Sequence, residues 1–199
     1  TYENTRGLQR KIAKGTARII QATISRGFNY WHVSFTVYER KRIPETHRNP
    51  GSVVGIDMGV GDHVIVAANP HGDEVMRRGL PTTISDHEKR IRHLQHKLSR
   101  KRGPDKRTKT APSNRWIRAN NQVRKYHNTM ANVRRDFAAK AVHKLAKNYE
   151  TVVIEDLNVR AMMTCSGAYK RGLNRAIAQA SFADLRRRIT YKTRWNGGR

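Results

Sequence analysis

Two short segments near the start of the chain are rich in β-branched and aromatic residues. They cover residues 17–24 and 30–38, and the polar, glycine-containing residues 26–29 separate them. Side chains of this kind fit the pleated surface of a strand, so the pattern predicts a β-hairpin over residues 17–38. A basic stretch with two prolines, residues 40–50, then predicts a boundary between the hairpin and the next unit.

Three further apolar segments follow this boundary, at residues 52–60, 63–68 and 74–77. Gly61 and Asp62 lie between the first two and are typical of a turn that reverses the chain. The order predicts a meander of three strands, which is a common opening of an antiparallel or mixed sheet.

The spacing of apolar residues then changes to that of a helix. A first helix is predicted from a cap at Ser85 or Asp86 to Gly103, with its apolar face formed by Ile91, Leu94 and Leu98. A second, much longer amphipathic helix is predicted from Ser113 to about Asn148. Its apolar stripe repeats every seven residues and consists of Trp116, Val123, Met130 and Phe137, extended by Ala141 and Leu145.

The last part of the chain contains one more strand and one more helix. Residues 151–156 are strongly apolar and end in two carboxylates, so they predict a short strand. A loop over 162–171 is expected to precede a final helix whose buried face is formed by Phe182, Leu185 and Ile189. The alternation of strands and helices predicts the α/β class, with a mixed sheet flanked by long helices.

The charge balance changes this picture by pointing to a class of partner. The chain has 199 residues, with 41 Lys or Arg against 15 Asp or Glu, and a formal charge of +26. Phosphate contacts by basic residues release counterions, so nucleic acid is the expected partner and binding should weaken steeply with salt. The periodic apolar segments argue against a disordered polycation. A histone-like or ribosomal protein is the alternative, although such proteins usually lack carboxylates at the ends of buried strands.

Cysteine and hydropathy patterns limit the setting of the protein. The single cysteine, Cys165, excludes an intramolecular disulfide and a cysteine-rich zinc site built from these residues alone, and it suits a reducing cytoplasm. No apolar run approaches the roughly 20 residues that span a bilayer, so no membrane association is expected. Because the sequence begins at Thr1 rather than at a methionine and stops at residues 195–199 (WNGGR) without a polar tail, we expect a fragment of a longer protein.

Two carboxylates, Asp57 and Glu155, follow strongly apolar strands and are the strongest candidates for chemistry. A carboxylate in such a position is expected to be buried, and burial is costly unless the group is paired or binds a cation. Carboxylates on neighbouring strands are a common way to hold the Mg²⁺ ions of phosphodiester cleavage. The alternative for either residue alone is that the strand ends in an acid because the chain returns to solvent.

An ordered set of motifs resembles the TnpB-like transposon-encoded RNA-guided DNA endonucleases, which are related to type V CRISPR effectors. It consists of residues 55–60 (GIDMGV), 132–137 (NVRRDF), 153–158 (VIEDLN) with Met162, and 181–185 (SFADL) with Tyr191-Lys192. The resemblance covers most of the chain from Val53 onward. It implies an RNase H-like (RuvC) core over residues 51–199, preceded over residues 1–45 by the end of a wedge-like β-barrel domain.

The resemblance also implies roles for these carboxylates and for the partners. Asp57 and Glu155 would be the first two catalytic ligands of Mg²⁺ or Mn²⁺, with guide RNA and target DNA as partners in a prokaryotic, nucleoid-associated setting. In the family a four-cysteine zinc ribbon and a third catalytic Asp follow the Tyr-Lys segment, and this sequence ends before them. Asp184 is not expected to replace the third ligand, so the segment alone should cleave poorly or not at all.

Basic residues are the candidates for contact with nucleic acid. A dense block leaves the first helix and enters a Gly/Pro loop, and further residues follow on the long helix: Lys97, Arg100, Lys101, Arg102, Lys106, Arg107, Lys109, Arg115, Arg118, Arg124 and Lys125. A solvated helix face is the alternative explanation for such a run. Trp116 and Phe137 are expected in the core, whereas the sequence leaves the place of Tyr126 open.

Other polar residues have ordinary explanations. We expect Asp62 to be a solvated turn residue, Asp156 to form an ion pair on the face opposite Glu155, and Asn158 to serve a turn. His93 and His96 have a metal-binding spacing but no third ligand nearby. Three functions remain open: an RNA-guided endonuclease core, a cleavage-dead homologue that binds RNA or DNA, and, less favoured, a transposase that joins DNA.

Overall fold

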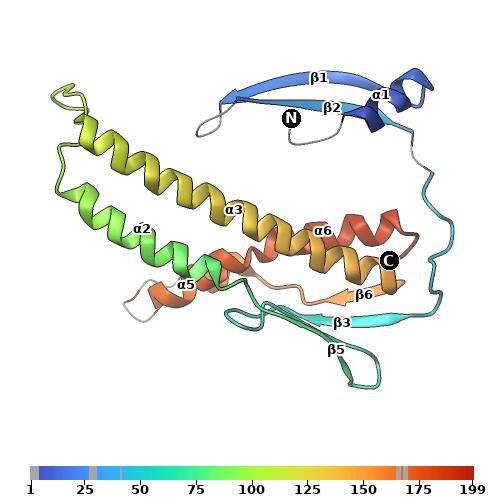
Figure 1. The fold of residues 1–199 in the computed structure, drawn as a ribbon. Coiled ribbons are helices and arrows are strands. Elements are labelled where there is room, and N and C mark those ends of the chain that lie inside the picture. The colour runs from blue at the N-terminus through green and yellow to red at the C-terminus, as the bar shows by residue number, and fades with distance from the viewer. Residues whose placement is uncertain (1–4, 27–30, 41, 165–166, 168–169) are drawn as a thin grey trace. The chain divides into compact units, whose positions relative to one another are not determined.

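The computed structural model describes residues 5–26, 31–40, 42–164, 167 and 170–199 (Figure 1). The chain forms two units, residues 1–42 and residues 43–199. Residues 27–29 of the predicted connection at 26–29, and Cys165, lie outside the described residues.

The first unit is a helix followed by two long strands. Helix α1 spans Arg6–Ala13, and strands β1 (Ala17–Arg26) and β2 (Trp31–Glu39) pair antiparallel from Ala17↔Glu39 to Arg26↔Trp31. The pairing confirms the strands of the predicted hairpin. A register shift lies between Ile19 and Gln21. The described residues of this unit form one two-stranded sheet and no closed barrel, so the wedge-like domain stays a prediction.

The second unit is built on a four-stranded mixed sheet. Its strands are β3 (Val53–Asp57), β4 (Ile65–Ala68), β5 (Glu74–Arg78) and β6 (Thr151–Ile154), in the order β5-β4-β3-β6. The first three form the predicted antiparallel meander, and β6 pairs with β3 in parallel. This arrangement confirms the mixed sheet.

The described residues of this unit include five helices. They are α2 (Thr83–Ser99), α3 (Asn114–Asn148), α4 (Val159–Met163), α5 (Lys170–Ala180) and α6 (Phe182–Trp195). The long helix and the final helix were predicted correctly, and Ser113 caps α3 by accepting a hydrogen bond from the Trp116 amide at 3.2 Å. None of the described helices combines the length and the apolar character needed to cross a membrane.

Two predicted boundaries were wrong. The first helix begins at Thr83, with Thr82 in the cap position, because Ile84 is buried and the apolar face therefore starts before Ser85. The expected loop over 162–171 is shorter than predicted, since α4 continues to Met163 and α5 begins at Lys170. Helix α5 was missed because its buried side, which includes Ile177 and Ala180, presents few large apolar residues.

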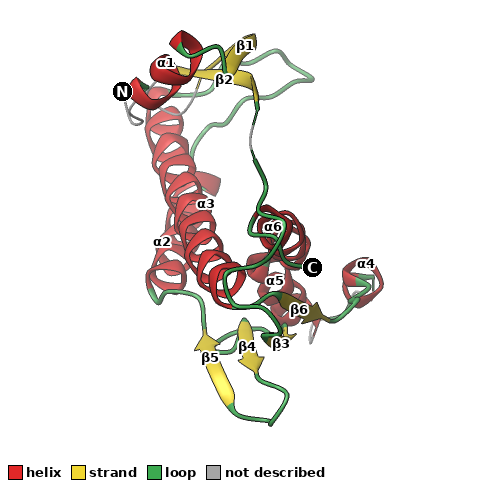
Figure 2. Cartoon of the chain, turned by 90° about the vertical axis from the view of Figure 1, so that its right-hand side faces the viewer, coloured by secondary structure: helices red, strands yellow, loops and turns green. Residues whose placement is uncertain are grey.

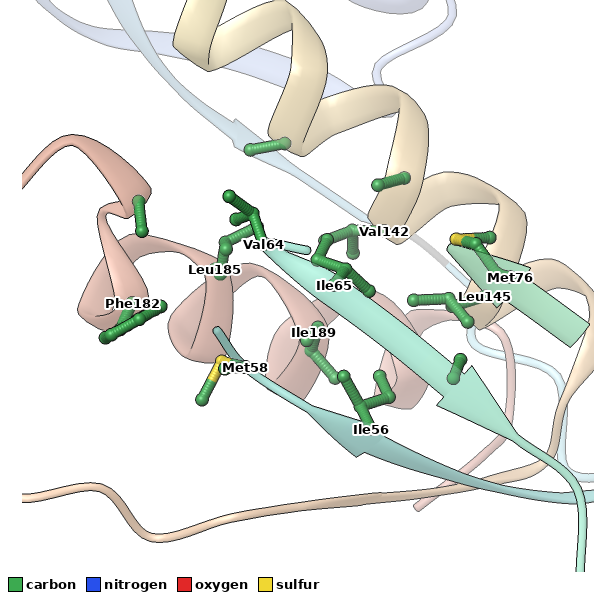
Figure 3. Packing of buried hydrophobic residues seen from close by; sticks show 14 of the residues in the cluster. Ile56, Met58, Val64, Ile65, Met76, Val142, Leu145, Phe182, Leu185 and Ile189 are labelled. Atoms are coloured by element: carbon green, nitrogen blue, oxygen red, sulfur yellow. The ribbon is translucent and has the colours of Figure 1, made fainter. Parts of the chain in front are cut away.

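Helices α3 and α6 pack on one face of the sheet, as Figure 2 shows. The core between them contains Ile56 from β3, Val64 and Ile65 beside or within β4, Leu145 from α3, and Leu185 from α6 (Figure 3). Burial of such large aliphatic side chains is worth about 1.5–3 kcal/mol each. A second cluster, formed by Ile84, Ile91, Val123 and Met130, holds α2 against α3.

Further hydrogen bonds hold the segments that flank β3 and β6 in place. The chain before β3 is tied to the end of α3 because His47, which is buried, places Nε2 3.2 Å from the Ala146 carbonyl oxygen. On the other edge of β6, the Arg199 amide donates to the Glu150 carbonyl and the Val152 amide donates to the Arg199 carbonyl, at 2.8 and 3.0 Å. This alternating pattern is that of a parallel neighbour.

Candidate functional site

Asp57 and Glu155 lie at the same edge of the sheet. Strands β3 and β6 pair in parallel from Val53↔Thr151 to Ile56↔Ile154. Asp57 is the last residue of β3, and Glu155 directly follows β6, so each stands one position beyond the last pair. Parallel strands end at a common edge, and the register therefore places these two carboxylates on neighbouring strand ends.

The two carboxylates belong to the open face of the sheet. In β3 the side chains of Val54 and Ile56 are buried whereas Gly55 and Asp57 are exposed, and in β6 the side chain of Val153 is 55% exposed. Successive side chains of a strand alternate between its faces, so Glu155 follows Val153 onto the exposed side.

The expected burial of Asp57 and Glu155 was wrong, because both are exposed. The apolar runs that precede them had suggested strands covered on both faces. In the described residues, helices cover only the face that carries Val54 and Ile56. Desolvation therefore gives no reason for a bound cation, and the register of the two strands alone supports one.

The surroundings of the pair leave room for a ligand. Gly55 is exposed on the same face, and a Cβ added there would meet only the Ala68 carbonyl oxygen, at 3.9 Å. Within the part of the chain that the structure describes, neither Asp57 nor Glu155 forms an ion pair, although the chain carries 41 Lys or Arg. Hard carboxylate oxygens suit Mg²⁺ or Mn²⁺, so the donor chemistry fits the expected ion.

Asp156 and Asn158, which follow β6, have structural partners. Asp156 forms an ion pair with Arg186 of α6, the helix on the covered face, which agrees with the prediction that it points away from Glu155. Asn158 caps α4 by accepting a hydrogen bond from the Ala161 amide at 3.0 Å.

Other acidic and histidine candidates do not complete the pair. Asp184 lies on α6, where Arg187 and Arg188 donate to its two oxygens at 2.5 and 2.6 Å. Partial burial raises the pKa of Asp184, but these hydrogen bonds outweigh it and hold the pKa below its ordinary range. His93 and His96 are exposed, and the described residues contain no group of three or more His, Cys, Asp or Glu that could hold a metal.

The basic block lies at the connection of α2 to α3, at the end of the helical pair that is far from the sheet (Figure 1). All its residues are exposed except Lys101, which is half-buried: Lys97, Arg100, Lys101, Arg102, Lys106, Arg107 and Lys109. Asp105 shapes the loop, because its Oδ1 accepts from the Arg107 amide at 2.8 Å and its backbone pairs with Thr110. The loop thus presents its cations on an ordered turn.

The long helix continues this basic surface. Arg115, Arg118, Arg124 and Lys125 are all exposed on α3. The place of Tyr126 is now settled, because its ring packs against the second core cluster and its hydroxyl accepts from Arg90 at 3.3 Å. Trp116 is half-buried, and Phe137 packs against the main core, as predicted.

Sequence reasoning missed a pocket of about 570 Å³ beside the carboxylate edge. Met58, which follows Asp57, and Leu157, which follows β6, form part of its apolar lining, and Arg186, Arg187 and Arg194 of α6 supply charge. The run of three arginines at 186–188 was the available signal. Without knowledge of where α6 packs, that run was indistinguishable from an ordinary solvated helix face.

Comparison with known proteins agrees with the family suggested by the motifs. Residues 34–166 match the family OrfB_IS605, described as "Probable transposase". The chain is 28% identical over 193 residues to the "Putative RNA-guided DNA endonuclease InsQ" of Escherichia coli K12, covering 92% of this chain and 44% of that protein. A "Putative RNA-guided DNA endonuclease" of Streptomyces pristinaespiralis is 32% identical over 147 residues, covering 73% of this chain and 32% of that protein.

A Mycobacterium tuberculosis H37Rv protein whose name also begins "Putative RNA-guided DNA endonuclease" is 28% identical over 198 residues. That match covers 99% of this chain and 41% of the relative. The chain therefore spans less than half the length of these curated relatives.

Proposed function

Because the chain belongs to the OrfB_IS605 family, we propose that it forms part of the nuclease core of an RNA-guided DNA endonuclease associated with a transposon. The observation that carries the proposal is the pairing of β3 with β6, which brings Asp57 and Glu155 to neighbouring strand ends on one open face. A fold alone supports many activities, so this site has more weight than the architecture around it.

The sheet supports an RNase H-like (RuvC) fold for this core. Three antiparallel strands are followed, after a long helical connection, by β6 in parallel beside the first of them. The backbone of Arg199 occupies the next position beyond β6, again with parallel hydrogen bonding. We take the sheet order, together with helices α3 and α6 on one face, as the architecture that positions the carboxylates.

The proposed role of Asp57 and Glu155 is to hold Mg²⁺ or Mn²⁺ through their carboxylate oxygens. When bound, such ions activate water and stabilise the leaving oxygen in phosphodiester cleavage. Gly55 keeps the open face flat beside the carboxylates, so that a nucleic-acid strand can approach them closely. Arg186, by pairing with Asp156, fixes the segment that follows Glu155.

The proposed partners are guide RNA and target DNA, in a prokaryotic, nucleoid-associated setting. In RNA-guided systems base pairing reads the sequence, and the protein binds the backbone of the heteroduplex through a basic channel. Two sets of exposed basic residues are candidates for such contacts. One lies on the ordered loop around Lys106 and Arg107, and the other lies on α3, which follows this loop. A third metal-ligating carboxylate and a zinc ribbon are part of the proposal only by resemblance to the family.

A second candidate function is nucleic-acid binding without cleavage. It is favoured by the absence, among the described residues, of any group of three or more His, Cys, Asp or Glu able to hold a metal. Two exposed carboxylates bind a divalent ion weakly, whereas the net charge of +26 supports binding to nucleic acid on its own. On this alternative the chain acts by occupying DNA or RNA.

Isothermal titration of Mg²⁺ and Mn²⁺ into the chain tests the metal assignment. We expect saturable binding that is lost in both Asp57→Ala and Glu155→Ala. Asp62→Ala is the matched control, because Asp62 is an exposed acid in the turn after β3 and is not one of the proposed ligands. Equal metal binding by the wild type and all three variants would refute the assignment of Asp57 and Glu155 as metal ligands. If nucleic-acid affinity were intact in that case, the binding-only function would replace the endonuclease core.

A further inference from the structure

A second pocket, of about 370 Å³, lies between the middle of α3 and the corner where α5 meets α6. Neither Asp57 nor Glu155 lines it, so it is separate from the proposed metal site. Its polar lining comes from Arg134 and Arg135 of α3 and from Gln179, Ser181, Arg187 and Arg188 around the corner.

The pocket concentrates positive charge in a hollow. Four arginines and one acid, Asp184, are its charged lining residues, which gives four positive charges minus one negative charge, or a net charge of +3. Like charges gathered in a concave surface repel one another more than they do on an open surface, because low-dielectric walls focus their field. An anionic ligand relieves this repulsion.

Asp184 orients two of the four arginines, and most N–H donors of these two arginines stay available. Its Oδ1 accepts one hydrogen bond from Arg187 Nη2, at 2.5 Å, and its Oδ2 accepts one from Arg188 Nε, at 2.6 Å. A guanidinium carries five N–H donors, so each of these two arginines retains donors for a ligand. Fixing the groups in advance reduces the entropy lost when they bind an anion.

The backbone at the corner sets the start of α6. Ser181 has φ 55° and ψ 45°, a left-handed conformation that is uncommon for a residue other than glycine, and α6 begins at the next residue. The amides of Asp184 and Leu185 donate to the Ser181 carbonyl, at 2.9 and 3.1 Å. This turn fixes the direction in which α6, which carries Arg187 and Arg188, leaves the corner.

We propose that this pocket binds a phosphate group of the nucleic-acid backbone. Arginine forks match the oxygens of phosphate in pairs, and several of them around one site are typical of phosphate recognition rather than of a solvated face. The volume is near the lower limit of about 300–1,000 Å³ for small-ligand pockets, which suits a phosphate with its attached sugar. The assignment of the phosphate to a polynucleotide rests on the proposed function; the phosphate chemistry does not.

Salt-dependent binding of a labelled single-stranded DNA, in buffer without divalent ions, tests the proposal. We expect the double variant Arg134→Gln, Arg188→Gln to lower the slope of log K against log salt by about 0.7 for each phosphate that the pocket no longer neutralises. The double variant Lys89→Gln, Arg92→Gln is the control for the removal of two charges, because both residues are exposed on α2 and line neither pocket. Arg134→Lys keeps the charge and should retain most of the slope.

Titration of inorganic phosphate, followed by ³¹P nuclear magnetic resonance, separates the two sources of the ligand. Loss of both phosphate and DNA binding in the double variant supports a backbone phosphate. Loss of phosphate binding alone supports a site for a small free phosphate compound. The proposal would be overturned if the pocket double variant kept its melting temperature and bound both probes like the control Lys89→Gln, Arg92→Gln. Because Asp57 and Glu155 stay intact and divalent ions are absent, this outcome is independent of the metal assignment.

Discussion

Removing one carboxylate of the proposed metal pair should stabilise the metal-free protein. Asp57 and Glu155 stand at adjacent parallel strand ends, both are exposed, and no ion pair to either is present among the described residues. Two like charges on neighbouring strands repel each other, and the repulsion is present only in the folded state. Glu155→Gln keeps the shape of the side chain and removes this repulsion.

The magnitude follows from the strand spacing. Charges about 6 Å apart, on strands separated by about 4.8 Å, repel by about 0.7 kcal/mol in water. Salt at about 0.1 M, with a Debye length of about 10 Å, reduces this to about 0.4 kcal/mol. The variant also makes a very basic chain more positive, which opposes the gain. Asp62→Asn is the reference, because it changes the net charge by the same amount but leaves both Asp57 and Glu155 in place.

Differential scanning calorimetry with and without Mg²⁺ checks the prediction. In EDTA and low salt, Glu155→Gln should melt about 1–2 °C above Asp62→Asn. At a Mg²⁺ concentration ten times the dissociation constant, binding should stabilise the wild type and Asp62→Asn by about 1.4 kcal/mol and Glu155→Gln by much less. The order of melting temperatures should therefore reverse.

Two results would contradict this prediction. If Glu155→Gln and Asp62→Asn melted together in EDTA at low salt, the two carboxylates would not face each other. If Mg²⁺ shifted all three proteins equally, its binding would not involve Glu155. High salt offers an internal check, because the difference in EDTA should vanish as ionic strength rises.

Three further predictions concern what holds the site in place. Leu145→Ala, at a core side chain that is 1% exposed, should lower the free energy of unfolding by about 2–5 kcal/mol in urea titrations, whereas Leu173→Ala, at an exposed site, should change it by less than about 0.5 kcal/mol. Ser113→Ala should cost about 0.5–2 kcal/mol in the same assay, because it removes the cap of α3, while Thr82→Ala, at a cap position with no side-chain hydrogen bond, should cost less. Asp184→Asn should be less stable than the wild type near neutral pH. Because the pKa of Asp184 is lowered in the folded protein, this difference should persist above the unfolded value of about 3.9 and disappear on acidification through the folded value.

Most of the fold could be predicted from the periodicity of apolar residues. The sheet segments and the long helix were predictable because alternation and the seven-residue stripe through Val123 and Met130 report directly on burial. Helix α5 was not, since it buries small side chains such as Ala180 that leave a weak pattern. The start of α2 was misplaced because Ser85 looks like a cap, yet burial of Ile84 draws the helix one turn earlier.

The candidate site was predictable in part. Asp57 and Glu155 could be identified as candidates because each follows an apolar strand. Their proximity could not be predicted from local patterns, because it depends on the parallel pairing of β3 with β6. Their exposure could not be foreseen, because a run such as Thr151–Ile154 is equally apolar whether helices cover one face of a sheet or both. The arginine pocket escaped notice because Arg134 and Arg188 are 54 positions apart and meet only through the packing of α3 on α6.

Exposure of the pair changes how a metal would be held. A buried pair repels strongly and binds a cation tightly, whereas two exposed carboxylates lose little solvation and have only weak mutual repulsion to relieve. Asp57 and Glu155 alone should therefore hold Mg²⁺ weakly, and a phosphate oxygen of bound nucleic acid would supply a further hard ligand. Linkage then requires that nucleic acid raise the affinity for Mg²⁺ by the same factor as Mg²⁺ raises that for nucleic acid at this site. The open face permits this coupling, because Gly55 and Asp57 are both exposed on it and Gly55 has no side chain to obstruct a strand.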